Sequence, residues 1–473
     1  MDLVELSACR VVELLQGNKI SPRELLDVLE AQIAAVDSRV NALPILCFER
    51  AHERACAIEA TPVAERGLLA GLPVAIKDLS NVAGVRSTQG SPIFADFIPE
   101  TSDYVVEQIE REGGIVYAKS NTPEFGAGAN TFNEVFGATR NPWDLHMSAA
   151  GSSGGSAVAL ATGMAWLAQG SDMGGSLRNP ASFCNVVGMR SSPGRVPRGP
   201  VSDPYATLSA EGPMARTIDD VALFLDAMST PDRREPLSLE KPVTPFRRLA
   251  ENRTPPKRVA FSADLGITPV NPEVAAVCRQ AADRFADMGV PVEEAHPDFS
   301  AAHETFQTLR AHDFAVGMTD LFRDHSDALK PEVIWNIEKG LALTSLEIGR
   351  AQRDRGNMVG EACRFFETYD LLLTPATIVP PFPVEERFVK ECAGQTFETY
   401  IDWLAIAYAI TLVSLPALSL PCGFTKSGLP VGLQMVGKMR GEGALLAAAG
   451  VLEDALGIDH TPIRPREAAL ASG

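Results

Sequence analysis

The amino-acid sequence predicts an α/β fold, with a central mixed β-sheet sandwiched between layers of α-helices and with a helical insertion. Three observations support this class. Short apolar runs bounded by Gly or Pro recur along the chain, and such runs are typical of buried strands. Helical patterns lie between these runs, and strands that alternate with helices favour a layered α/β architecture. Finally, the stretch from about Ala301 to Thr368 carries only helical patterns.

The 473 residues contain no linker-like stretch, no repeat of fixed period and no low-complexity block. We therefore expect a single domain over residues 1–473. Within it, residues 1–65 are expected to form N-terminal helices, residues 66–230 the core with the catalytic residues, and residues 295–368 a helical insertion near the substrate pocket. The Pro-rich, charge-dense segment 230–256 is the best candidate for a seam within this one body.

Local patterns justify the elements in order. In "SPRELLDVLEAQIAAVD", Ser21 is the expected N-cap, and Glu24 completes a capping box. Further helices are predicted in "FERAHERACAIEA", "SDYVVEQIERE", "PEVAAVCRQAADRFADMG" and "GEGALLAAAGVLEDAL". Strands are predicted in "GLPVAIKDL", "GGIVYAKS", "KRVAFSADLG", "YDLLLTPA", "PALSLPCG" and "VGLQMVG". The Ala-rich run "AVALATGMAWLAQG", from Ala157 to Gly170, is expected to be a buried helix.

Composition argues against several classes of partner. The formal charge of −18 disfavours nucleic acid, because phosphate contacts need clustered Lys and Arg. The eight cysteines form no CxxC pair, so neither a metal site nor a disulfide framework is expected, and no cofactor is predicted. The N-terminus lacks a secretory pattern, and no apolar run reaches the roughly 20 residues that cross a bilayer. We expect a cytoplasmic protein without membrane contact, and a homodimer stays open.

Three residues could carry chemistry: Lys77 at the end of "PVAIK", Ser152 in "GSSGGS" and Ser176 in "GSDMGGS". In the plainer interpretation the lysine is exposed and the serines only serve Gly-rich turns. Burial, however, can lower the pKa of a lysine by roughly 3 to 5 units, which would make Lys77 a base for a serine nucleophile. The glycines before Ser176 could direct backbone N–H groups toward one point and form an oxyanion hole.

The Gly-rich segment also matches G-x-S-x-G, the nucleophile elbow, which would nominate Ser153. That motif needs a preceding strand and a suitably placed histidine. The preceding residues, "NPWDLHMSAA", make a poor strand, and none of the seven histidines follows an apolar strand pattern. A flexible linker is disfavoured too, because the segment opens directly onto an apolar run. The lysine-based site is therefore the favoured interpretation.

The stretch "AGSSGGSAVALATGMAWLAQGSDMGGSLRNPASFCNVVGMRSSPGRV" resembles the central block of the amidase signature family, and the likeness covers nearly the whole chain. The resemblance implies the amidase-signature fold and a Ser–cis-Ser–Lys triad. Ser176 matches the nucleophile, Ser152 matches the bridging serine that follows a cis peptide bond, and Lys77 matches the base. The residues that match the oxyanion donors are Met173, Gly174 and Gly175. Those that match positions expected to hold this loop are Asp172 and Arg178.

The sequence departs from the family pattern at a few positions. Ala150 stands where the family usually has Gly, and Ser191 and Ser192 stand where Pro and Thr are common. None of these changes removes a reactive group. Asn179 stands where the A-type subunit of glutamyl-tRNA amidotransferase typically has Gln, which favours other branches of the family.

The resemblance implies hydrolysis of an amide C–N bond through a serine acyl-enzyme. The predicted substrate is a small hydrophobic aryl or alkyl amide, and ester or carbamate (urethane) bonds are within reach of the same chemistry. Candidate substrate-binding residues are Phe125, Gly126 and Phe132, with Phe136, Phe322, Trp335 and Trp403 as further aromatic residues that could equally be core. Two alternatives stay open: a glutamyl-tRNA(Gln) amidotransferase A-type subunit that releases ammonia from glutamine, and a catalytically silent binding protein on the same fold.

Overall fold

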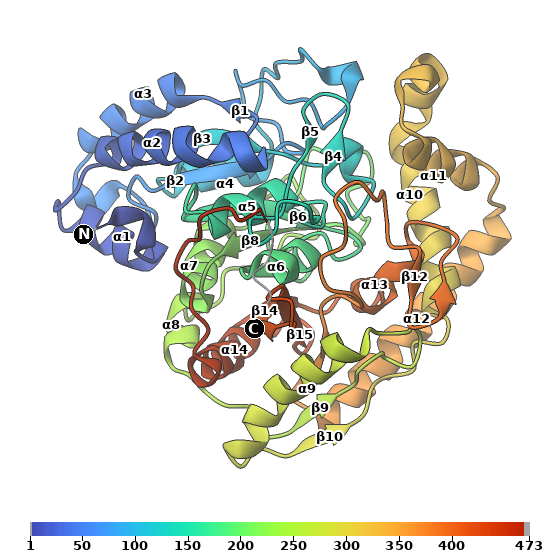
Figure 1. Ribbon diagram of the computed structural model, residues 1–473. Coiled ribbons are helices and arrows are strands. Elements are labelled where there is room, and N and C mark those ends of the chain that lie inside the picture. Colours follow the sequence, from blue (N-terminus) through green and yellow to red (C-terminus); the bar gives the residue numbers. More distant parts are fainter. Residues whose placement is uncertain (1, 468–473) are drawn as a thin grey trace.

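The computed structural model describes residues 2–467 of the chain (Figure 1). At its centre is an 11-stranded sheet with the strand order β1-β3-β2-β6-β8-β7-β14-β15-β11-β9-β10. The strands of this sheet are β1 (Ile45–Leu46), β2 (Pro73–Lys77), β3 (Ile115–Ser120), β6 (Leu167–Asp172), β7 (Val187–Arg190), β8 (Ala210–Ala215), β9 (Val259–Phe261), β10 (Val292–Glu294), β11 (Leu371–Pro375), β14 (Ala417–Phe424) and β15 (Pro430–Val436). Two small hairpins lie outside it: β4 (Phe132–Asn133) with β5 (Gly137–Ala138), and β12 (Glu391–Cys392) with β13 (Gln395–Thr396).

The directions of the strands make the sheet mixed, as the sequence predicts. Strands β3, β2 and β6 are parallel neighbours on one side, and β11, β9 and β10 are parallel neighbours on the other. The pairs between β6 and β11 are antiparallel. Because β2 and β6 run parallel, their C-terminal ends lie at the same edge of the sheet. Lys77 ends β2 and Asp172 ends β6, so the sheet itself brings these two segments together.

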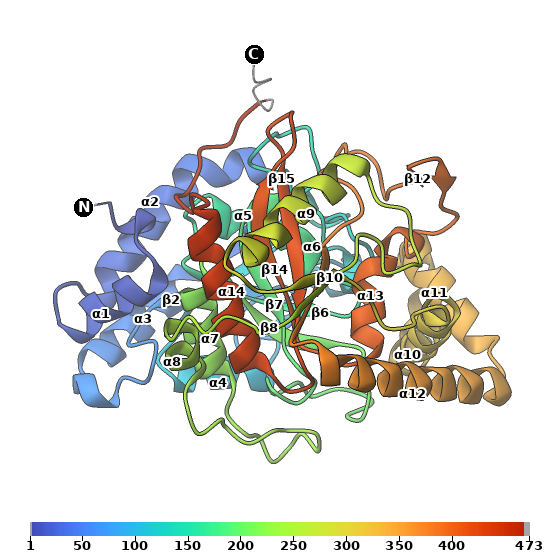
Figure 2. The same ribbon diagram turned by 90° about the horizontal axis from the view of Figure 1, so that it is seen from below.

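Helices cover both faces of the sheet. In Figure 2, α9 and α14 lie in front of β14 and β15, and α5 and α6 lie behind them. In Figure 1, helices α1 to α3 lie on one side of the molecule, and α10 to α12 project on the opposite side. The α-helices are α1 (Ala8–Gln16), α2 (Pro22–Val40), α3 (Phe48–Glu59), α4 (Tyr104–Arg111), α5 (Gly154–Ala161), α6 (Arg178–Cys184), α7 (Ile218–Met228), α8 (Phe246–Glu251), α9 (Pro272–Asp287), α10 (Ala302–His325), α11 (Pro331–Leu341), α12 (Ser345–Thr368), α13 (Ala405–Leu412) and α14 (Glu442–Leu456).

Most elements predicted from local patterns are confirmed. The six predicted strands are β2, β3, β9, β11, β14 and β15, and the predicted helices include α2, α3, α4, α9 and α14. The capping box is present, because the Ser21 side chain accepts from the Glu24 backbone N–H and the Glu24 side chain accepts from the Ser21 backbone N–H. The stretch expected to be helical contains α10, α11 and α12, with a short 3-10 turn at Ser326–Ala328.

The single helix predicted from Ala157 to Gly170 is wrong in its second half. Helix α5 ends at Ala161, and Gly163 follows with φ +71°, a left-handed conformation that favours glycine. The chain then enters β6, where Leu167 pairs with Val74 of β2 on one side and with Ala215 of β8 on the other. An apolar run of this length fits a helix or a buried strand, and here the partners in the sheet decide the outcome. Strands β7 and β8 were not predicted either.

The apolar core follows the sheet. Most buried apolar side chains form one continuous cluster. A second, small cluster joins Ala127 to the helices α10 and α11 through Phe314, Leu329, Val333 and Ile337. Over residues 2–467, no helix is both long and apolar enough to cross a membrane.

Candidate active site

Lys77 is a fully buried lysine whose ammonium group points at serines. Its Nζ donates to Ser152 Oγ at 2.7 Å and to Ser171 Oγ at 3.2 Å. Its backbone N–H donates to Gln169 Oε1 at 3.0 Å, which fixes the end of β2 against β6. The structure therefore brings Lys77 and Ser152, which are 75 residues apart, into direct contact.

Burial gives Lys77 the pKa of a base. Removal from water lowers the pKa of Lys77 to about 7, although the negative charges of Glu211 and Asp172 act to raise it. Among residues 2–467, no carboxylate forms an ion pair with Lys77. Lys119, on the adjacent strand β3, is equally buried, but its Nζ lies 2.7 Å from Asp78 Oδ1. Of these two lysines, Lys77 is thus the one whose charged form is not stabilised by a contacting carboxylate.

The Gly-rich segment is tightly packed. A Cβ atom at Gly154 would lie 2.3 Å from Thr131 Oγ1, and one at Gly155 would lie 2.3 Å from Asn121 N. The peptide bond between Gly151 and Ser152 is cis, as the resemblance implies. These glycines allow the segment to pack closely against Thr131 and Asn121, so it is not a flexible linker.

Ser153 does not have the exposure of a nucleophile. Its side chain is fully buried, and its Oγ donates to the Ser171 carbonyl at 3.3 Å. Its backbone N–H donates to the Ser176 carbonyl at 3.2 Å. This second bond holds the segment of Ser152 beside the segment of Ser176.

The loop that carries Ser176 is held by a buried ion pair. Arg178 donates from Nε and Nη2 to the two oxygens of Asp172, at 3.0 and 2.8 Å. Asp172 also accepts from the Leu177 backbone N–H at 3.1 Å. Burial acts to raise the pKa of Asp172, but the charges of Arg178 and Arg190 and the bonds from Arg178 outweigh it and hold the pKa below its ordinary value. Asp172 is therefore an anion that fixes the loop.

The amides of this loop differ in their availability. The Gly175 N–H donates to Asp172 Oδ1 at 2.9 Å, so it already has a partner. The N–H groups of Met173, Gly174 and Ser176 donate to no other group in the described part of the chain. The Ser176 side chain is half-buried, and its hydroxyl likewise has no partner within residues 2–467. The free donors thus differ from the predicted set, with Ser176 in place of Gly175.

Comparisons with known proteins place the chain in a family. A family model described as amidase matches residues 24–446. The chain belongs to the amidase signature family. An acylamidase from Rhodococcus erythropolis is 34% identical over 459 residues, covering 95% of each protein. The A-type subunit of a glutamyl-tRNA(Gln) amidotransferase from Moorella thermoacetica is 35% identical over 479 residues, covering 96% of this chain and 97% of that protein.

Solved structures give the same result. A bacterial aryl acylamidase of the amidase signature family aligns with a TM-score of 0.89 at 27% identity, covering 95% of this chain and 96% of that one. A 6-aminohexanoate cyclic dimer hydrolase aligns with a TM-score of 0.87 at 27% identity, covering 98% and 99%. The amidase-signature fold is confirmed, and the chain is a hydrolase that acts on carbon–nitrogen bonds other than peptide bonds.

Sequence reasoning missed several polar residues around the lysine of this amidase. Gln169 bridges Lys77 and Glu211, because its Oε1 accepts from the Lys77 backbone and its Nε2 donates to Glu211 Oε2 at 2.5 Å. Ser171 pairs across the sheet with Glu211. Arg190 donates to the Asp172 carbonyl. Gln169 and Ser171 lie on β6, so recognising "LAQGSD" as a strand would have placed these two residues near Lys77. Arg190 and Glu211 lie on β7 and β8, which were not predicted.

The predicted substrate-binding residues of the amidase have three different surroundings. A Cβ at Gly126 would lie 3.3 Å from Ser152 Oγ, so this residue borders the site directly. Phe125 packs against the small apolar cluster below α10 and α11, as does Phe322. Phe132 lines a cavity of about 350 Å³ together with Lys330 and Arg387.

The remaining aromatic candidates lie elsewhere in the amidase. Trp335 borders a different, polar cavity of about 580 Å³. Trp403 is buried in the main core, where its ring packs edge-on against Phe382. Phe136 is half-buried beneath the guanidinium of Arg86. Gly126 is thus the candidate that the structure places beside the lysine and serine.

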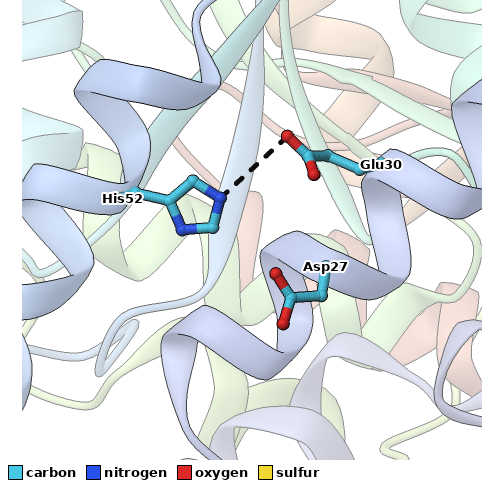
Figure 3. A group of neighbouring side chains, drawn as sticks. All are labelled: Asp27, Glu30 and His52. Atoms are coloured by element: carbon cyan, nitrogen blue, oxygen red, sulfur yellow. Dashed lines mark ion pairs between the residues drawn. The ribbon is translucent and has the colours of Figure 1, made fainter.

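One group of side chains in the described residues has the proximity that a metal ion requires: Asp27 and Glu30 on α2, with His52 on α3 (Figure 3). His52 Nε2 lies 4.0 Å from Glu30 Oε1. Both carboxylates are exposed, and exposed acidic groups often lie this close for other reasons. None of the candidate catalytic residues belongs to this group.

Proposed function

We propose that the protein hydrolyses the C–N bond of a small, hydrophobic aryl or alkyl amide through a serine acyl-enzyme. Ser176 is the proposed nucleophile, Ser152 the proton relay and Lys77 the base. The observation that carries the proposal is the 2.7 Å bond between Lys77 Nζ and Ser152 Oγ in a fully buried setting. A buried lysine with a pKa of about 7 is neutral in a large share of molecules at neutral pH.

The proton path follows from this arrangement. Neutral Lys77 accepts the proton of the Ser152 hydroxyl, and Ser152 accepts the proton of the Ser176 hydroxyl as Ser176 Oγ attacks the carbonyl carbon. The proton returns by the same path to the leaving amine when the C–N bond breaks. Water then attacks the acyl-enzyme, gives its proton to the same relay and releases the acid. Ser176 and Lys77 regain their starting states.

The developing negative charge on the carbonyl oxygen needs fixed donors. We propose that the N–H groups of Met173, Gly174 and Ser176 form the oxyanion hole, while Gly175 keeps its bond to Asp172. The Asp172–Arg178 pair acts on the reaction indirectly, because it holds the loop that carries these donors. Such a hole accepts any tetrahedral oxyanion, so ester and carbamate bonds are further proposed substrates.

The names of relatives support the choice of substrate. The Rhodococcus erythropolis relative is an acylamidase, and one structural neighbour is an aryl acylamidase. The alternative is an amidotransferase A-type subunit, the name of the Moorella thermoacetica relative. Purified alone, the chain should hydrolyse anilides under our proposal, whereas an amidotransferase subunit should need partner subunits and prefer glutamine. A cytoplasmic location and a homodimer remain predictions from the sequence.

A fluorophosphonate probe, which labels activated serines, tests the mechanism. The protein should be labelled, and Ser176→Ala should abolish both labelling and anilide hydrolysis. Ser153→Ala is the matched control, since Ser153 is buried beside the site without a proposed role, and this variant should still be labelled. Labelling that persists in Ser176→Ala would show that the nucleophile is another residue. A panel of anilides, primary amides, esters and carbamates then ranks the substrates.

A further inference from the structure

Helix α10 inserts a buried arginine beside the proposed oxyanion loop. The Arg310 side chain is 7% exposed, and its Nη1 lies 3.0 Å from the sulfur of Met173. Its Nη2 donates to the Tyr400 hydroxyl, which also accepts from Asn336 Nδ2 at 2.6 Å. Met173 is the first residue of the loop that ends in Ser176. Arg310 therefore contacts the loop that carries the proposed oxyanion donors.

The charge of Arg310 has no anion to balance it. Arg310 forms no ion pair with any residue from 2 to 467, and its Nε is buried with no hydrogen-bond partner. The Asn336 Oδ1 atom, on the adjacent helix α11, is also buried without a partner. Burying a cation without a counter-ion is costly, and the rings of Phe314 and Tyr400 on which Arg310 lies offset only part of that cost.

Three other buried arginines have the counter-ion that Arg310 lacks. Arg178 and Arg190 both lie within 4 Å of the Asp172 carboxylate, and Arg195 lies 3.6 Å from Glu442. Each of these side chains is paired within the fold. Arg190, Arg195 and Arg216 also have a buried nitrogen without a partner, so a free donor alone does not set Arg310 apart. Arg310 combines the missing ion pair with direct contact to Met173 of the proposed oxyanion loop.

A second cation approaches from the same insertion. Lys330, which precedes α11, donates from Nζ to the Ala127 carbonyl, next to Gly126 at the site. Burial is the main factor that lowers the pKa of Lys330 to about 8, and the positive charge of Arg310 contributes to the same shift. The two cations are thus close enough to repel each other. The carboxylates of Glu332 and Glu124 also act on Lys330, and they offset part of this positive charge.

We propose that Arg310 binds the carboxylate of an amide substrate, with Lys330 adding to the attraction. This inference rests on the proposed amide hydrolysis and narrows its substrate class to amides that carry an anionic group as well as an apolar body. A guanidinium donates in a planar fork that matches a carboxylate, and an anion at Nε would supply the missing counter-charge.

Two pairs of matched substrates test the inference in the unmodified protein. The first pair places the charge on the acyl side: succinanilic acid against 4-methylpentananilide. The second places it on the leaving group: 4-acetamidobenzoate against 4-isopropylacetanilide. In each pair an isopropyl group replaces a carboxylate of similar shape. We expect the carboxylate to raise kcat/KM by about tenfold or more in one of the pairs. If the neutral member is preferred in both pairs, the inference is wrong.

Arg310→Met then assigns the preference to the arginine. The readout is the ratio of kcat/KM within a pair, so that a general loss of activity cancels. We expect the preference for the carboxylate to fall by about tenfold or more. Arg310→Lys should retain an intermediate preference, and it decides the question if the methionine variant does not fold. Arg323→Met is the control, because Arg323 is exposed on the same helix and pairs with Asp320 and Asp324. An unchanged ratio in the Arg310 variants overturns the proposal.

Failure of this inference is distinguishable from failure of the proposed function. If Ser176 is not labelled and none of the four amides is hydrolysed, the proposed function itself fails, and the inference fails with it. If Ser176 is labelled and the neutral anilides are hydrolysed without any dependence on Arg310, the amidase mechanism stands and only the carboxylate site is wrong.

Discussion

The core around the Gly-rich segment and helix α12 of the helical insertion differ in how tightly they are packed. Glycines of the core lie against backbone: a Cβ at Gly155 would lie 2.3 Å from Asn121 N and 2.6 Å from the Ala42 carbonyl oxygen. Gly349 and Gly356 on α12 have open space around the Cβ position, whereas a Cβ at Gly340 of α11 would lie 2.0 Å from the Ala311 carbonyl oxygen of α10. The core segment therefore has no room for added side-chain atoms at Gly155, whereas α12 has room for them at Gly349 and Gly356.

The core and the helical insertion each contain a buried basic side chain that forms no ion pair within residues 2–467. In the core, Asp172 is satisfied by Arg178, and Lys119 is satisfied by Asp78. Lys77 forms no ion pair, and burial lowers its pKa toward that of a base. In the insertion, Arg310 likewise forms no ion pair with any residue from 2 to 467. An unpaired charge marks the proposed proton transfer in one region and the proposed substrate contact in the other.

The largest expected effect tests the unpaired lysine of the core. Lys77→Met keeps the volume of the side chain but removes the base, so kcat/KM for an anilide should fall by about 10³-fold or more. The measurement is steady-state hydrolysis, with circular dichroism to verify the fold. Lys438→Met is the control, because Lys438 is half exposed and pairs with Asp370 at the surface. Retention of more than a tenth of the activity in Lys77→Met would exclude Lys77 as the base.

Sequence patterns were sufficient for much of the core. The run "PVAIK" predicted a buried strand that ends in a lysine, and Lys77 is fully buried at the end of β2. The Ser21 capping box was equally local, because a four-residue pattern specifies both of its hydrogen bonds. Such features depend on residues close together in the chain, and local sequence therefore predicts them.

Contacts between distant segments could not be predicted in the same way. The run from Ala157 to Gly170 fits a helix until the neighbours β2 and β8 are known, and only they make its second half a strand. Arg310 contacts Met173 and Tyr400, which lie 137 and 90 residues away in the chain. No local pattern shows which arginine of a helix is buried without a counter-ion.

The second prediction tests the packing of the core. Gly155→Ala should destabilise the protein by about 3 kcal/mol, since the added methyl group has no room beside the backbone of Asn121 and Ala42. Thermal or urea denaturation measures the change. The added methyl group would also displace the backbone segment that carries Ser152, so activity at low temperature should fall as well. Wild-type stability in Gly155→Ala would mean that the core is not packed as described.

The third prediction concerns the pH dependence of the core. Activity should require neutral Lys77 and therefore rise as the pH increases through about 7. Burial raises the pKa of Glu211 to about 7, and its ionised form raises the pKa of Lys77. Glu211→Gln should therefore lower the pKa of Lys77 and move the acid limb of the profile to lower pH. An interaction of about 1 kcal/mol corresponds to a shift of somewhat less than one pH unit. The profile of kcat/KM against pH for an anilide gives the shift, and a movement to higher pH would contradict the assignment.

The smallest effect is expected in the insertion and has the opposite sign to that of Gly155→Ala. Gly356 lies inside α12 with nothing within 4 Å of its Cβ position, so Gly356→Ala adds a methyl group without a clash. Alanine favours a helix interior over glycine by about 1 kcal/mol, and the variant should be more stable by up to that amount. Thermal denaturation of Gly356→Ala beside Gly155→Ala measures both signs in one experiment. The kcat/KM ratios for the matched carboxylate and isopropyl substrates should not change in Gly356→Ala, because α12 presents this position away from neighbouring atoms. A loss of stability in Gly356→Ala would mean that α12 is packed as tightly there as the core is at Gly155, and the contrast between the two regions would then be wrong.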